Sequence, residues 1–215
     1  IFFPFSLLNL FLIIKREKPD LIHTWMYHAD LIGGIIGRLG GCKEIIWCVR
    51  NSNIDKKFTP GLTRVVIKFC SLISNFIPSK IVYCSKNSAR LHEKMGYPAS
   101  KSVIIHNGVN YNFFKPINNI KKNILRILKI SPEKFILGLV SRWNPQKDLE
   151  NFISTMGNLK SENFYNWHLI MVGENIDINN GRLTKILKKN KIFENTTLLG
   201  FKKNLISIYN SMDIN

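Results

Sequence analysis

The chain has 215 residues, and its 31 lysines and arginines against 14 aspartates and glutamates give a net charge of +17 at neutral pH. Hydrophobic residues make up 45% and charged residues 21%, which excludes a disordered tail, a collagen-like repeat and a disulfide-stapled miniprotein. The length suits one large α/β domain or two small ones. Because the chain starts with Ile1 rather than Met and stops at Asn215 without a polar tail, we expect a piece of a longer protein.

Residues 1–14 form an almost continuous apolar run. The run is shorter than the roughly 20 residues that a helix needs to cross a bilayer. It also lacks the basic start and the small-residue cleavage site of a signal peptide. We expect a buried helix of a domain whose beginning is missing, and the alternative is a segment that associates with a membrane.

The following hundred residues alternate short apolar runs with amphipathic segments. The expected strands are 20–25, 44–49, 80–84 and 102–106, and the expected helices are 28–39, 62–76 and 86–95. Gly33, Gly34 and Gly37 indicate that the first of these helices packs closely on a sheet, and Ser85 is placed to cap the last one. This β-α-β order predicts a parallel sheet with helices on its faces.

Turn-forming residues interrupt the alternation at 107–116, and a polar stretch follows at 118–122. We therefore place a domain boundary here, with a first domain at 1–115 and a second at 116–215. The second half starts the alternation again. Its expected strands are 135–141, 167–172 and 197–199, and its expected helices are 120–128, 148–159, 183–189 and 205–211.

The cysteines indicate the compartment and argue against a metal site. Cys42, Cys48, Cys70 and Cys84 form no C-x-x-C pair and have no histidine at ligand spacing. Each lies in or beside an apolar run, so we expect buried, reduced thiols and a cytoplasmic protein. No metal and no cofactor are expected.

The charge of +17 suits nucleic acid, an anionic membrane or phosphorylated substrates. The basic residues are mostly lysines and are scattered, without the interleaved aromatic residues of a single-strand binding surface. We expect a solvated lysine surface and no nucleic acid partner. Peripheral contact with an anionic membrane is the next interpretation.

The second half contains the sharpest chemical signal. An apolar strand ends just before Arg142, and Lys147 immediately precedes the next helix. Ligands of doubly wound proteins bind at this carboxyl edge of the sheet, and a helix start favours a phosphate. Two cations at such a turn would hold a diphosphate and stabilise it as it leaves. The alternative is an ordinary surface loop that carries an arginine and a lysine.

Five segments in order resemble one enzyme family. Residues 142–153 resemble the G-R-x4-K-G/D-x3-L-I segment of GT-B-fold retaining glycosyltransferases of family 4, also called group 1. The other four are K-P-D-L-I-H at 18–23, N-G-V-N with its following phenylalanines and proline at 107–116, L-I-M-V-G-E at 169–174, and the stretch 198–213. The resemblance implies an α/β, GT-B-like fold with two Rossmann-like parallel-sheet domains facing a cleft, both incomplete in this chain.

The resemblance also implies roles for individual residues of the second half. Arg142 and Lys147 would grip the diphosphate of the donor. Gly173 would line the donor cleft, and Gly200 with Phe201 would lie against the nucleotide base.

In the first half, the resemblance implies a histidine on the acceptor side. We favour His28, at the start of a helix, as the catalytic residue over His23, which lies in a strand and is interpreted as a core histidine. Arg50 follows the next strand at the same edge and is expected to contact the acceptor or a phosphate. The alternative for Arg50 is a surface ion pair with an acidic neighbour.

The departures from the family pattern affect what can be expected of this chain. Lys202, Lys203 and Asn204 stand where the family often has arginine and aspartate, which puts the usual contacts of that loop in doubt. Asp148 stands where glycine is commoner. The glycine-rich loop expected before residue 1 and the E-x7-E segment expected beyond residue 215 are not in the chain, so we expect the piece alone to be inactive.

The resemblance thus implies that the chain is a fragment of a metal-independent, retaining hexosyltransferase. It would move a sugar from a nucleotide-diphosphate-sugar donor to a hydroxyl of a saccharide or lipid-linked acceptor, in polysaccharide or glycolipid biosynthesis. The expected location is the cytoplasm, at most peripheral to the inner face of the membrane. The alternatives are a sugar-nucleotide epimerase or phosphorylase of the same fold and a basic nucleic-acid-binding protein.

Overall fold

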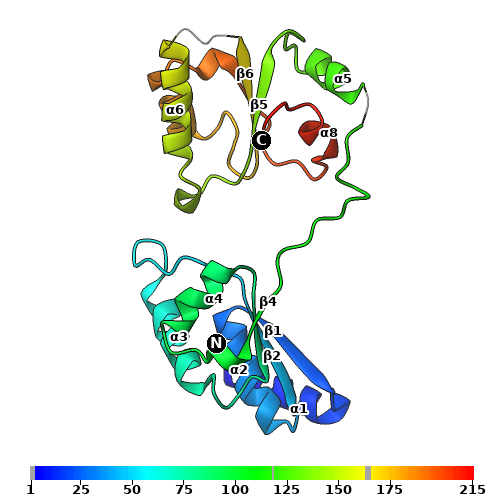
Figure 1. Ribbon diagram of the computed structural model, residues 1–215, viewed down its shortest axis with the longest axis vertical. Coiled ribbons are helices and arrows are strands. Elements are labelled where there is room, and N and C mark those ends of the chain that lie inside the picture. The colour runs from blue at the N-terminus through cyan, green and yellow to red at the C-terminus, as the bar shows by residue number, and fades with distance from the viewer. Residues whose placement is uncertain (1–2, 118, 163–165) are drawn as a thin grey trace. The chain divides into compact units, whose positions relative to one another are not determined.

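The computed structural model describes residues 3–117, 119–162 and 166–215 (Figure 1). It divides into two compact units, Ile1–Gly108 and Val109–Asn215, so the division lies a few residues before the boundary expected at 115 and 116. Each unit is an α/β structure with its own parallel sheet, which confirms the predicted fold class.

The first unit contains a four-stranded parallel sheet with strand order β1-β2-β3-β4. Its elements in chain order are α1 (Phe3–Glu17), β1 (Leu21–Trp25), α2 (Tyr27–Leu39), β2 (Glu44–Val49), α3 (Gly61–Ile73), β3 (Lys80–Tyr83), α4 (Lys86–Glu93), a 3-10 turn (Ala99–Lys101) and β4 (Ser102–Ile104). The expected elements are confirmed, with ends that differ by at most three residues.

The core of the first unit lies between the sheet and the helices. Ile45, Trp47 and Val49 of β2 are completely buried, and Ile67 and Cys70 of α3 complete this side of the core. On β1, the side chains of Leu21, His23 and Trp25 lie on the other face of the sheet and are exposed. Figure 1 correspondingly shows α2, α3 and α4 on one side of the sheet.

Two local predictions in this unit are confirmed. A Cβ on Gly34 would lie 2.8 Å from Ile77 Cγ2 and 2.9 Å from Trp47 Nε1. The helix α2 therefore packs more closely on its neighbours than a larger residue at this position would allow. Ser85 caps α4, because its hydroxyl accepts a hydrogen bond of 3.1 Å from the Ser88 N–H.

The expectation of a buried first helix is wrong for most of α1. Ile1 and Phe2 lie outside the described residues. Within α1, Phe5, Leu8 and Leu12 are 71%, 55% and 54% exposed, whereas Ile14 is buried. The reason is that α1 contacts the rest of the unit mainly through α2, so much of its surface faces solvent.

Among the described residues, no helix combines the length and the apolar character needed to cross a membrane.

The second unit contains a three-stranded parallel sheet with strand order β5-β6-β7. Its elements are α5 (Ile120–Ile127), β5 (Phe135–Val140), a 3-10 turn (Pro145–Lys147), α6 (Leu149–Ser161), β6 (Trp167–Val172), α7 (Gly181–Lys189), a 3-10 turn (Phe193–Asn195), β7 (Thr196–Leu198) and α8 (Ile206–Tyr209). All six residues of β6 are buried, as expected for the central strand of a sheet covered on both faces.

Two separate clusters cover the faces of this sheet. Leu149 and Ile153 of α6 and Leu183 of α7 pack on one face, and Leu125 of α5 and Ile208 of α8 pack on the other. In Figure 1, α6 therefore lies on the opposite side of β5 and β6 from α5 and α8.

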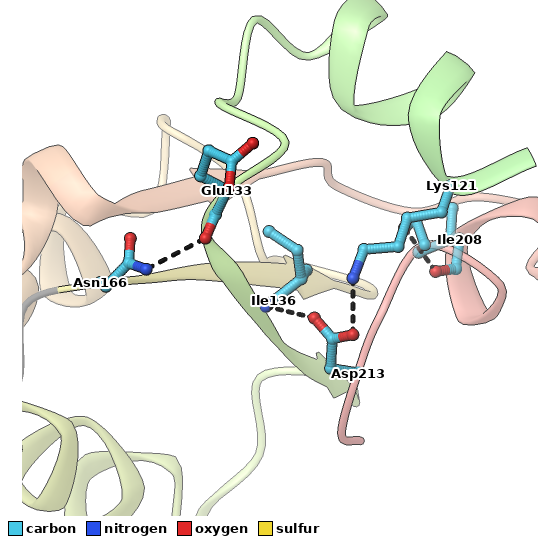
Figure 2. Close-up of polar contacts among 7 residues, drawn as sticks. Lys121, Glu133, Ile136, Asn166, Ile208 and Asp213 are labelled. Atoms are coloured by element: carbon cyan, nitrogen blue, oxygen red, sulfur yellow. Dashed lines mark hydrogen bonds and ion pairs between the residues drawn. The ribbon is translucent and has the colours of Figure 1, made fainter.

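A carboxylate near the end of the chain links three parts of this unit (Figure 2). Asp213 accepts a hydrogen bond of 2.5 Å from Lys121 Nζ on α5 and one of 2.7 Å from the Ile136 N–H on β5. The Gly138 N–H then donates to the Ile214 carbonyl at 2.7 Å. Asp213 thus fixes the segment after α8 beside β5.

We predict that Asp213→Ala lowers the free energy of unfolding by about 1–2 kcal/mol at pH 7, because it leaves the Ile136 N–H without its acceptor. Burial alone would raise the pKa of Asp213, but the hydrogen bonds from Lys121 and Ile136 outweigh it and the pKa is lowered. This stabilisation is present above the carboxyl's unfolded pKa and is lost as the pH falls through the folded pKa. Urea unfolding at pH 7 and at low pH measures both effects. Glu162→Ala, at an exposed position after α6, is the control, and equal stability of Asp213→Ala and wild type at pH 7 would contradict the account.

Candidate functional site

The carboxyl ends of all three strands of the second unit meet at one pocket of about 430 Å³. Chain segments that follow β5, β6 and β7 supply most of its wall, as expected for a ligand site of a parallel sheet. The lining residues are Val140, Ser141, Arg142, Lys147, Val172, Gly173, Glu174, Phe201, Lys202 and Leu205. The structure therefore brings four of the five residues predicted on the donor side, Arg142, Lys147, Gly173 and Phe201, into one cavity.

Backbone hydrogen bonds continue past the strand ends and form the base of this pocket. The Ser141 N–H donates to the Val172 carbonyl at 2.9 Å, and the Gly173 N–H donates to the Gly200 carbonyl at 3.0 Å. The fifth predicted residue, Gly200, does not line the pocket itself. It accepts the Gly173 hydrogen bond from the segment that follows β7.

Gly173 occupies a position that no other residue fits. Its φ is +150°, in a region that side chains rarely adopt, and a Cβ there would lie 2.0 Å from the Ser141 carbonyl oxygen and 3.0 Å from the Arg142 N. Since these neighbours are backbone atoms, they have no rotamer to change. The close approach brings the chain after β6 against the start of the Arg142 loop.

The pocket carries more positive than negative charge. Arg142, Lys147 and Lys202 line it, and Glu174 is the one acidic residue among its lining residues. Within the part of the chain that the structure describes, none of the three cations forms an ion pair. The arrangement is therefore able to receive an anion without first breaking an ion pair.

Lys202 also lines the pocket, which the sequence does not predict. In the sequence, Lys202 and Lys203 are a departure from the family pattern. The available signal was position, because Lys202 follows Gly200 and Phe201 at the end of the β7 segment, at the same sheet edge as Arg142.

The turn that presents Lys147 is tightly determined. The Asn144 side chain accepts a hydrogen bond of 2.9 Å from the Gln146 N–H, and Asp148 has the left-handed conformation, with φ +49°. The helix α6 accordingly begins at Leu149, one residue later than expected. The positive φ gives a physical reason for the glycine that is commoner at the position of Asp148.

His28 lines a second pocket, of about 580 Å³, which is formed by residues of the first unit. His28 is exposed in the first turn of α2, and His23 and Trp25 of β1 line the same pocket. His23 is exposed too, so its interpretation as a core histidine is wrong. Its ring lies 5.4 Å from that of Trp25.

Buried polar contacts fix the helix start that carries His28. The Thr24 hydroxyl donates a hydrogen bond of 2.6 Å to the buried Asp30 carboxyl, and the Met26 N–H donates to the Cys48 carbonyl at 2.9 Å. Met26 itself has φ +71° and ψ 157°, a strained conformation for a residue with a side chain. Burial raises the pKa of Asp30 to about 7, although the Thr24 hydrogen bond opposes the shift.

Arg50 lies directly after β2 and is exposed. Its guanidinium stacks over the Trp25 ring, 4.6 Å from the centroid, and donates to the Asn107 side-chain oxygen. In the described residues it has no acidic partner, so the alternative of a surface ion pair is not observed. An aromatic ring and an amide hold this cation instead.

The cysteines are free thiols, with Cys42, Cys48 and Cys70 buried and Cys84 half-buried. Within the described ranges, no three cysteine, histidine or acidic side chains gather as a metal site would require.

We predict that Gly173→Ala destabilises the protein by at least about 3 kcal/mol or prevents folding, because the added methyl overlaps backbone atoms. Gly181→Ala is the matched control, since a Cβ at that position meets no atom within 4 Å. Circular dichroism and urea unfolding of both variants measure the difference. Wild-type stability of Gly173→Ala would show that the two strand ends do not approach as described.

Both halves of the chain match known family models. A model described as Glycosyltransferase Family 4 matches residues 1–113, and one described as Glycosyl transferases group 1 matches residues 120–215.

Two curated bacterial proteins are similar over nearly the whole chain. One is the UDP-Gal:alpha-D-GlcNAc-diphosphoundecaprenol alpha-1,3-galactosyltransferase of Escherichia coli, with 23% identity over 97% of this chain and 54% of the relative. The other is the capsular polysaccharide biosynthesis glycosyltransferase CapM of Staphylococcus aureus, with 24% identity over 97% of this chain and 55% of the relative. The chain spans about half the length of these curated relatives.

Solved structures show the same fold. HepE from Anabaena in complex with UDP-glucose matches with a TM-score of 0.82 and 16% identity, over 97% of this chain and 55% of that protein. Sucrose-phosphate synthase from Thermosynechococcus elongatus matches with a TM-score of 0.77 and 14% identity, over 98% and 53%. The two parallel sheets are thus GT-B-like, and, with one family model covering more than half of it, the chain belongs to glycosyltransferase family 4.

Proposed function

We propose that this chain is part of an enzyme that transfers a hexosyl group from a nucleotide-diphosphate sugar to a hydroxyl of a saccharide or lipid-linked acceptor, with retention, in polysaccharide or glycolipid biosynthesis. One observation carries the proposal: Arg142, Lys147 and Lys202 line a single pocket at the carboxyl edge of the second sheet. The relatives support it, since one is a UDP-Gal-dependent galactosyltransferase and a structural neighbour holds UDP-glucose. A UDP-sugar is therefore the first donor to test.

The cations of the pocket suit a diphosphate that becomes a leaving group. As the bond between the sugar C1 and the diphosphate oxygen breaks, negative charge accumulates on the diphosphate. Arg142 and Lys147 would stabilise this charge more strongly in the transition state than in the bound donor, which is the condition for lowering the barrier. Lys202 would add a third positive charge on the β7 side.

The nucleotide base would lie against the segment that follows β7. Phe201 is 68% exposed beside the pocket, so its ring is available to stack on a base. Gly173 adds no side chain to the adjacent wall of the pocket. Its N–H donates to the Gly200 carbonyl, which fixes its position.

The acceptor would contact residues of the first unit. His28 would approach the acceptor hydroxyl, and the Arg50 guanidinium would contact a phosphate of a lipid-linked acceptor. This assignment is supported by the exposure of both side chains and by their positions, after β1 and after β2, at the carboxyl edge of the first sheet. The contacts of Arg50 with Trp25 and Asn107 would hold it ready for an anion.

The enzyme would act in the cytoplasm in peripheral contact with an anionic membrane. The E. coli relative is named for an acceptor linked to diphosphoundecaprenol. A net charge of +17 favours attraction to an anionic leaflet.

We predict that Arg142→Ala and Lys147→Ala each weaken UDP binding about tenfold, because each removes a charged hydrogen-bond donor from the diphosphate. Isothermal titration of UDP into the 215-residue chain measures the affinity, and higher ionic strength should weaken it. Lys185→Ala, on the exposed side of α7, is the control of equal charge change. If both pocket variants bind UDP as tightly as wild type, the diphosphate assignment is wrong.

A further inference from the structure

The carboxyl edge of the first sheet brings together residues from three strand ends. His106 lies two residues after β4, and its Nδ1 is 3.1 Å from the carbonyl oxygen of Cys84, directly after β3. The side-chain oxygen of the next residue, Asn107, accepts a hydrogen bond from Arg50, directly after β2. The segment after β4 is thus held to the ends of β2 and β3, at the edge where parallel sheets bind ligands.

The contact with Cys84 determines which ring nitrogen of His106 carries the hydrogen. A carbonyl oxygen can only accept a hydrogen bond, so Nδ1 is the donor and Nε2 of the neutral ring keeps its lone pair. His106 is exposed, and within the described ranges its ring makes no other hydrogen bond. The ring therefore offers a ligand one hydrogen-bond acceptor, in an orientation that the backbone fixes.

Arg50 and Asn107 supply the complementary donors. The Arg50 guanidinium stacks on the Trp25 ring, which covers one face and leaves the N–H groups at its edge. Its bond to Asn107 uses the amide oxygen, so the two N–H bonds of the amide nitrogen remain for a ligand. The chain after Arg50 is fixed as well, because the buried Ser88 hydroxyl donates to the Asn51 carbonyl at 2.7 Å.

The combination of a cation, an amide donor and a neutral acceptor selects a class of ligand. A phosphate group alone presents acceptor oxygens, which match Arg50 and Asn107 but not His106 Nε2. A sugar alone has hydroxyl donors for Nε2 but no charge to match the guanidinium. A sugar phosphate has both kinds of group in one small molecule.

We propose that His106 is an acceptor-binding residue and that it holds a sugar phosphate together with Arg50 and Asn107. The phosphate oxygens receive hydrogen bonds from Arg50 and Asn107, and a sugar hydroxyl donates to His106 Nε2. The inference rests on the proposed function, in which the acceptor is a saccharide or lipid-linked, and it narrows the acceptor to a sugar that carries a phosphate.

The test is titration of glucose 1-phosphate into the 215-residue chain in the presence of saturating UDP. UDP occupies the donor pocket of the second unit, so the remaining binding belongs to other sites. Wild type is expected to bind glucose 1-phosphate at least about tenfold more tightly than glucose or inorganic phosphate. The imidazole NMR signal that is absent from His106→Asn identifies His106, and this signal is expected to shift during the titration.

Two variants separate binding from structure. The amide of His106→Asn is still able to donate to the Cys84 carbonyl but has no atom at the position of Nε2. This variant is expected to lose about fivefold in affinity for glucose 1-phosphate and none for inorganic phosphate. Arg50→Ala is expected to lose at least about tenfold for both ligands. Arg126→Ala, exposed on α5, makes the same charge change and should bind as wild type does.

A second ligand distinguishes the two sources of a sugar phosphate. Glucose linked through a diphosphate to farnesol represents a lipid-linked acceptor, and glucose 1-phosphate represents a soluble one. Both use the same three residues, so His106→Asn should weaken both. Tighter binding of the farnesyl compound supports the site with a lipid-linked acceptor, and equal binding supports it with a soluble acceptor.

Two results would overturn the proposal once circular dichroism shows that the variants are folded. They are equal affinity of His106→Asn and wild type for glucose 1-phosphate, and equal affinity of wild type for glucose and glucose 1-phosphate. UDP titration of the same samples separates this proposal from the proposed function. Loss of glucose 1-phosphate binding while UDP still binds is the result expected of the Arg50 variant. Wild type that binds UDP but not glucose 1-phosphate refutes only the acceptor site, and the reverse refutes only the donor site.

Discussion

The close approach of two strand ends in the second unit determines the rest of its site. The chain after β6 passes so near the Ser141 carbonyl that residue 173 has room for hydrogen only. This contact aligns the Arg142 loop with the end of β6, and the Gly173–Gly200 hydrogen bond adds the segment that carries Phe201 and Lys202. The loop that carries Arg142 and Lys147 and the segment that carries Lys202 thereby line one pocket. The pocket thus depends on a backbone contact more than on any charged side chain.

The two units support their exposed residues in different ways. In the second unit, hydrophobic clusters on both faces of the sheet and the Asp213 link hold the strands that end at the pocket. In the first unit, the helices cover one side of the sheet, while α1, β1 and α3 present apolar side chains outward. The first unit therefore exposes apolar side chains, and the second has a pocket lined by three cations.

Much of this arrangement could be predicted from the sequence, since hydrophobic periodicity defines strands and helices locally, and parallel strands necessarily bring their carboxyl ends to one edge. That logic predicts Arg142 and Lys147 at the edge of the sheet, and the family resemblance adds Gly173 and Phe201. Lys202 is not predicted in this way, because it departs from the family pattern, although its position after β7 places it at the same edge of the sheet. The exposure of α1 and of His23 is not predicted either. An apolar or alternating pattern indicates which face of an element can be buried, but it does not show whether another element packs on that face.

The central claim is that the pocket of the second unit binds the diphosphate of a nucleotide. Comparison of the affinities of the chain for UDP, UMP and uridine by isothermal titration tests it most directly. The account predicts that affinity rises with each phosphate, by about tenfold or more from uridine to UDP, and that added salt reduces this difference. Equal affinities for uridine and UDP would contradict the account, since they would show that the cations of the pocket do not contact the phosphates.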